Sequence, residues 1–179
     1  MHGAGNDYVF IDGRGLNEDW PSVAIDMSNR HTGVGSDGII LALPSKHADV
    51  RMVMFNADGS EGKMCGNGIR CLVDFAKRRK FFPDHIPTVV VQTASGDRQV
   101  TPILKNGQVI SAAVEMGEPI FESAEVPVNL PMLDQVVDYP IQIQSYSFRI
   151  TCVSMGNPHA VLFTDEPVDE YPLDEIGPK

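Results

Sequence analysis

The chain has 179 residues, of which 42% are hydrophobic and 21% charged, as expected for a soluble globular protein of one or two domains. A formal net charge of −10 and a pI near 4.8 argue against nucleic acids and anionic membranes as partners, and therefore favour a small-molecule ligand. No apolar run reaches the length of a membrane span and the first residues lack a secretory signal, so we expect a cytoplasmic protein.

The first two thirds of the chain predict a domain of strands and two helices. Short apolar runs that end at glycine or proline indicate strands, and Asn106-Gly107 is a strong hairpin signal. Apolar residues that recur at helical spacing, such as Ile69, Leu72 and Ala76, indicate a helix with one buried face. The predicted strands are 7–12, 39–43, 49–56, 88–93, 98–104 and 108–115, and the predicted helices are 20–30 and 67–80.

The composition changes after Gly117. An acidic, proline-rich stretch precedes three further predicted strands, at 139–144, 148–153 and 159–163, and residues from 172 onward read as a helix that stops early. We therefore expect two domains, 1–117 and 118–179.

Two segments that are far apart in the sequence resemble each other. Residues 5–12 (GNDYVFID) and 156–165 (GNPHAVLFTD) both run from Gly-Asn through an apolar stretch to Asp, with one insertion in the second. This similarity suggests two copies of one fold.

The stretch MCGNGIRC, residues 64–71, places Cys65 at or just before the start of a predicted helix. Unpaired N–H groups and the positive end of the helix dipole at this position favour a thiolate. Gly66 and Gly68 would let a ligand approach the N–H groups of Gly66, Asn67 and Gly68, and a carboxylate suits such a site. A base beside a bound carboxylate could remove the proton next to it. The alternative for Cys65 is a small apolar core residue.

The remaining polar candidates have ordinary structural explanations as well. Cys71 and Cys152 fit core positions, and three cysteines without a Cys-x-x-Cys pair indicate neither disulfides nor a zinc site. His159 could be structural or the proton partner of a thiol. Residues 33–38 (GVGSDG) lack the lysine of a phosphate loop, so we discount nucleotide binding. Four asparagines lie beside glycine, proline or a strand end; they suit turns, and also a ligand with both carboxylate and ammonium groups: Asn6, Asn56, Asn67 and Asn157.

Taken together, the motifs resemble those of the diaminopimelate epimerases. The matching pieces run in the family's order along the whole chain: MHGAGNDYVFID at 1–12, GVGSDG at 33–38, FNADGSEGKMCGNGIRC at 55–71, VEMGEPIF at 114–121 and GNPHAVLF at 156–163. The resemblance implies an α/β fold of α+β type, with two pseudo-symmetric domains. In each, a mixed and mostly antiparallel sheet would wrap around a central helix, and the substrate would lie between the domains. It also implies no metal and no pyridoxal phosphate, and leaves a homodimer open.

The resemblance assigns roles by position. Cys65 resembles one of two catalytic thiols, and His159 a histidine near those thiols. Gly66 and Asn67 match the loop that binds the substrate carboxylate, and the other three asparagines match substrate contacts: Asn6, Asn56 and Asn157. The implied reaction interconverts LL- and meso-diaminopimelate by removing a proton from one face of the α-carbon and returning one to the other, which requires two bases.

This sequence departs from the family pattern at three points. The family often has glutamine where Gly38 stands, and family members usually carry a few residues before MHGAGN. No second cysteine loop matches; the spacing from Asn6 to Cys65, applied from Asn157, places it beyond Lys179. We therefore expect a chain that holds the first domain and part of the second and is itself inactive. The alternatives are a proline or hydroxyproline racemase of the same fold group, and a folded fragment without catalysis.

Overall fold

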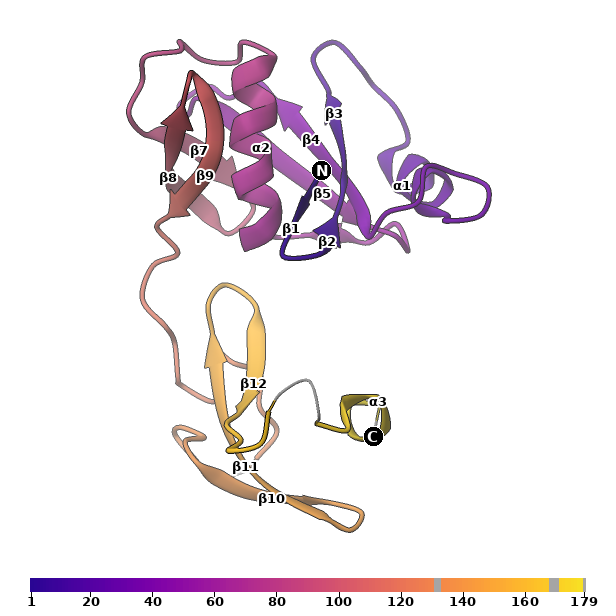
Figure 1. Ribbon diagram of the computed structural model, residues 1–179, viewed down its shortest axis with the longest axis vertical. Coiled ribbons are helices and arrows are strands. Elements are labelled where there is room, and N and C mark those ends of the chain that lie inside the picture. Colours follow the sequence, from indigo (N-terminus) through magenta and orange to yellow (C-terminus); the bar gives the residue numbers. More distant parts are fainter. Residues whose placement is uncertain (131–132, 168–170, 179) are drawn as a thin grey trace. The chain divides into compact units, whose positions relative to one another are not determined.

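A computed structural model describes residues 1–130, 133–167 and 171–178 (Figure 1). It divides into two compact units, Met1–Met116 and Gly117–Lys179, with Lys179 itself outside the described residues. The interpretation of these units as pseudo-symmetric halves stays a prediction. No helix in the described parts is long and apolar enough to cross a membrane.

The first unit is built on a seven-stranded mixed sheet. Its order is β3-β4-β5-β7-β8-β9, with β6 paired to β5; β3–β4 and β5–β7 are parallel and the other pairs antiparallel. A separate two-stranded sheet pairs β1 with β2. The strands are β1 (His2–Gly3), β2 (Asn6–Asp7), β3 (Val9–Asp12), β4 (Gly38–Leu43), β5 (Val50–Asn56), β6 (Glu61–Gly62), β7 (Val89–Thr93), β8 (Gly96–Lys105) and β9 (Gln108–Val114).

One helix covers each face of this sheet. β4 is buried on both faces: Ile40 and Ala42 lie in the core beneath α2 (Gly66–Arg78), whereas Ile39 and Leu41 lie in a second core with α1 (Trp20–Ser28). The helix predicted over 67–80 is confirmed, although it begins at Gly66 and ends at Arg78. The helix predicted over 20–30 ends two residues early, at Ser28.

The other predicted strands of this unit are present, with two differences. The strand predicted over 7–12 is interrupted at Tyr8, and the loop predicted between β5 and α2 contains the short strand β6. The Asn106-Gly107 hairpin is confirmed, since both residues have positive φ, at 53° and 78°.

The second unit contains a three-stranded antiparallel sheet. Its strands, all at the predicted places, are β10 (Tyr139–Ile143), β11 (Tyr146–Ser154) and β12 (Pro158–Leu162), followed by the one-turn helix α3 (Leu173–Ile176). A small core of Val126, Val136 and Cys152 packs against one side of it.

Candidate active site

Cys65 is the N-cap of α2. Its backbone is extended, and its sulfur accepts a hydrogen bond from the Gly68 N–H at 3.3 Å. A cap residue needs a side-chain acceptor for one of the first N–H groups, and here a thiol sulfur takes the place that Ser or Asp oxygen usually fills. The prediction that Cys65 lies at the start of the helix is confirmed.

A second donor reaches the same sulfur from a distant part of the chain. The Asn6 side-chain nitrogen, on β2, lies 3.6 Å from the Cys65 sulfur. The structure directs the Asn6 amide N–H to the thiol, and a contact between Asn6 and the substrate stays a prediction. Two N–H donors from distant parts of the chain therefore converge on the sulfur of Cys65.

Tyr8 is a site residue that the sequence did not reveal. It is buried, at 7% exposure, in the core that packs against Cys65. Burial, and then the neighbouring Cys65 side chain, raise the pKa of Tyr8 to about 12, so the phenol keeps its proton at neutral pH. In the sequence Tyr8 is only one residue of a predicted strand, and nothing there indicates that it lies beside Cys65.

Two backbone donors beside the thiol have no partner. Within the described parts of the chain, the N–H groups of Gly66 and Asn67 make no hydrogen bond, whereas that of Gly68 is taken by the sulfur. The expectation of three free N–H groups is therefore wrong for Gly68. Two adjacent donors without a partner among the described residues, at the positive end of a 13-residue helix, have the arrangement that suits an anion.

The two glycines of this turn serve different purposes. A Cβ atom on Gly68 would lie 2.4 Å from the Ile40 Cδ1 atom, so Gly68 serves core packing against β4. A Cβ atom on Gly66 would meet only Met116, at 3.6 Å. Gly66 alone leaves space for a ligand.

Arg70, also absent from the sequence candidates, holds the side chain of Asn67. Its guanidinium donates to the Asn67 Oδ1 atom and, through Nε, to the Gly66 carbonyl oxygen at 3.3 Å. The helix thus fixes the orientation of its own second residue.

Backbone hydrogen bonds tie the remaining loops of this unit to the site. The Asp37 N–H donates to the Asp7 carbonyl at 2.8 Å, and the Ala57 N–H donates to the Asp37 carbonyl at 3.1 Å. Arg30 bridges Asp7 and Asp37 and lowers the pKa of the Asp7 carboxyl. Asp37 therefore links Asp7, which follows Asn6, to Ala57, which follows Asn56. Asn56 uses its amide N–H on the Ser60 hydroxyl, at 2.9 Å.

Gly38 cannot carry a side chain in this backbone. A Cβ atom there would lie 2.2 Å from the Phe55 carbonyl oxygen on the paired strand β5.

Asn157 and His159 lie in the second unit, at the start of β12. The His159 Nε2 and Asn157 Oδ1 atoms are 3.2 Å apart and both side chains are exposed. That His159 faces a thiol stays a prediction. Cys152 is buried, as predicted, and burial raises its pKa; Cys71 is only half-buried, and burial raises its pKa too.

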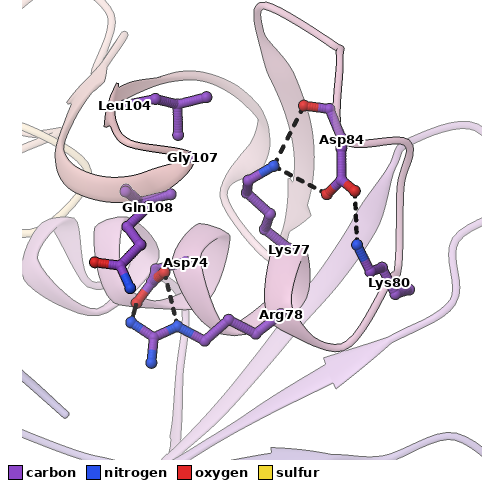
Figure 2. Close-up of a pocket in the computed structure, with 9 residues that line it drawn as sticks. Asp74, Lys77, Arg78, Lys80, Asp84, Leu104, Gly107 and Gln108 are labelled. Atoms are coloured by element: carbon purple, nitrogen blue, oxygen red, sulfur yellow. Dashed lines mark hydrogen bonds and ion pairs between the residues drawn. The ribbon is translucent and has the colours of Figure 1, made fainter.

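A cavity of about 630 Å³ lies at the opposite end of α2, and its charged side chains are all paired (Figure 2). Lys77 and Lys80 contact Asp84 at 3.0 and 2.6 Å, and Arg78 contacts Asp74 at 2.7 Å. This cavity therefore offers no unpaired charge to a ligand.

The family model and the curated relatives that match this chain belong to the same family. The family model described as diaminopimelate epimerase matches residues 1–122. A diaminopimelate epimerase of Methanococcus maripaludis is 44% identical over 99% of this chain, and one of Geobacillus thermodenitrificans 39% identical over 99%. The chain spans 63% and 61% of their lengths, respectively. A crystal structure of a hydroxyproline epimerase from Agrobacterium vitis is similar over 97% of this chain and 55% of that one, with a TM-score of 0.66 and 17% identity. The last comparison shows a shared fold only.

Proposed function

Because the chain belongs to the diaminopimelate epimerase family, we propose that it supplies the Cys65 half of a cofactor-independent epimerase that interconverts LL- and meso-diaminopimelate. The observation that carries this proposal is the juxtaposition at the start of α2. A thiol sulfur held by two N–H donors lies directly beside two N–H groups that have no partner among the described residues.

This arrangement suits removal of a proton from an α-carbon. The substrate carboxylate binds the free N–H groups of Gly66 and Asn67, which brings the α-carbon next to the Cys65 sulfur. As the proton leaves, negative charge spreads onto the carboxylate, and a preorganised donor of this kind contributes about 3 to 4 kcal/mol to stabilising such charge in other enzymes. The helix dipole acts in the same direction.

Inversion needs a second acid on the other face of the carbon. Cys71 and Cys152 are poor candidates because burial raises the pKa of both thiols. We assign the second thiol to sequence that the curated relatives have and this chain does not cover. We further propose that Asn157 binds substrate, that His159 acts near the thiols, and that the whole enzyme is a cytoplasmic homodimer in lysine and peptidoglycan precursor synthesis.

A chimaera tests the proposal. The 179 residues would be followed by the part of the Methanococcus maripaludis relative that they do not span. We expect the chimaera to epimerise LL-diaminopimelate, followed by circular dichroism, and to exchange the α-proton in heavy water, followed by NMR. Turnover of proline or hydroxyproline with none of diaminopimelate would instead assign the site to a racemase of the same fold group.

The 179-residue chain gives a complementary measurement. Calorimetry should detect diaminopimelate binding that is lost in Gly66→Val, while Gly107→Ala at the far end of the same unit serves as a control for general damage. Binding that survives in Gly66→Val would contradict the placement of the carboxylate.

A further inference from the structure

The side-chain amide of Asn67 is bound through only one of its two ends. The Oδ1 atom accepts from the Arg70 guanidinium, whereas the NH₂ group has no partner within the described residues. An amide can both donate and accept, so the bound end decides what the free end offers to a ligand.

Arg70 determines which end is bound. A guanidinium has five N–H donors and no acceptor, so it can pair only with the oxygen of the amide. If the Asn67 amide were flipped, its NH₂ group would face the N–H donors of the Arg70 guanidinium, and neither group could accept a hydrogen bond. Arg70 is itself anchored, because its Nε also donates to the Gly66 carbonyl one turn earlier.

Strand β1 passes close to this pair at Gly3. A Cβ atom on Gly3 would lie 3.1 to 3.3 Å from the Asn67 carbonyl oxygen, the Asn67 Cβ and the Arg70 Nη2 atoms. The strand therefore lies directly on the Asn67–Arg70 pair, and a side chain at position 3 would press on it.

We propose that Arg70 is a positioning residue that fixes Asn67 with its NH₂ group free as a donor, which makes the start of α2 selective for a carboxylate. The free groups at this turn are then all donors: the N–H groups of Gly66 and Asn67 and the Asn67 amide. This inference rests on the proposed function, since it assigns the carboxylate of the amino-acid substrate to these groups.

Calorimetric titration of the 179-residue chain with diaminopimelate tests the inference in four variants. Arg70→Met removes the contact and should weaken binding about tenfold, the value of one hydrogen bond to a charged group. Arg70→Lys, which keeps one donor, should recover part of that loss. Arg51→Met, an exposed arginine of β5, serves as the matched control and should bind as the wild type does.

The fourth variant separates positioning from a structural role. Asn67→Asp keeps the oxygen that Arg70 binds but replaces the NH₂ donor with a second oxygen that repels a carboxylate. It should lose more binding than Arg70→Met does while its midpoint of urea unfolding does not fall. The same substitution in an Arg70→Met background should lower that midpoint, because the new carboxylate then has no guanidinium partner.

Each outcome decides a separate question. A wild type that binds no diaminopimelate overturns the proposed function, and with it the ligand assignment, whereas the unfolding measurements still report on the Arg70 contact. A wild type that binds, together with unchanged binding in Arg70→Met or in Asn67→Asp, overturns the inference alone.

Discussion

At the N-terminal end of α2 the N–H groups of Gly66 and Asn67 have no partner in the described structure, and the Cys65 sulfur is held by two donors. At the C-terminal end the opposite holds: Lys77, Arg78 and Lys80 are each paired with a carboxylate, although the cavity of about 630 Å³ lies there. This difference favours the start of α2 over the cavity as the candidate site. Donors that have no partner can still form hydrogen bonds to a ligand, whereas the paired side chains of the cavity would first have to lose theirs.

Removal of the thiol is the strongest test of the difference between the two ends of α2. Cys65→Ala in the chimaera should lower epimerisation about 10³-fold or more, since general acid–base groups contribute 10²- to 10⁴-fold. The assay is circular dichroism of LL-diaminopimelate over time. Cys71→Ala, one turn and a half further along the same helix, is the matched control and should keep most of its turnover. Comparable losses in the two variants would remove the special role of Cys65.

The two glycines of the first turn should respond differently to substitution. Gly68→Ala should destabilise the fold by about 1–3 kcal/mol, because its methyl group would overlap Ile40 in a closely packed core. Gly66→Ala should leave the free energy of unfolding nearly unchanged, because its methyl group meets Met116 at an ordinary distance. Urea unfolding measures both. Equal destabilisation would mean that Gly66 also serves packing.

The three thiols should differ in their rates of alkylation. Burial raises the pKa of Cys71 and of Cys152, so both carry little thiolate near neutral pH, whereas the Cys65 sulfur is held by N–H donors. We expect iodoacetamide to modify Cys65 several-fold faster than either of the others, as followed by peptide mapping of the folded protein. Similar rates for all three would show that the donors around Cys65 do not make it more reactive than the other two thiols.

The smallest effect is expected at the paired end of the helix. Hydrogen bonds from Lys80 and Lys77 lower the pKa of Asp84 to about 2, so its contribution to stability is present above its unfolded pKa and is lost as the pH falls through about 2. The carboxylate is exposed, and Asp84→Asn should therefore change the unfolding midpoint slightly at pH 7 and by less as the pH falls to about 2. Diaminopimelate binding should be unaffected. Loss of binding in this variant would mean that the two ends of α2 are coupled.

The elements of this fold could largely be predicted from local pattern. The helical spacing of apolar residues predicts α2, and the continuous apolar run predicts the buried strand β4. The predicted start of α2 in turn places Cys65 at the helix N-terminus. The break at Tyr8 could not be predicted in this way, because an aromatic residue followed by the apolar run Val9–Ile11 continues a strand by local pattern.

The contacts of the site depend on distances that the sequence does not contain. Gly68 looks like a position open to a ligand until Ile40 of β4 is placed against it. Arg70 looks like an exposed helix residue until its guanidinium is seen on the Asn67 amide. Both belong to the motif MCGNGIRC, so the sequence predicts where the candidate site lies, while the contacts of each residue are determined by tertiary packing.

The two hydrogen bonds to the Cys65 sulfur also differ in how far apart along the chain their partners lie, and so in when they can form during folding. The Gly68 N–H is three residues away and is available once the first turn of α2 exists, whereas Asn6 is 59 residues away and arrives only after a long loop has closed. The first hydrogen bond is therefore local to α2, whereas the second depends on the long-range packing of β2 against the start of that helix. The environment of the thiol thus reports on folding progress, and alkylation during refolding should register Cys65 in two kinetic stages.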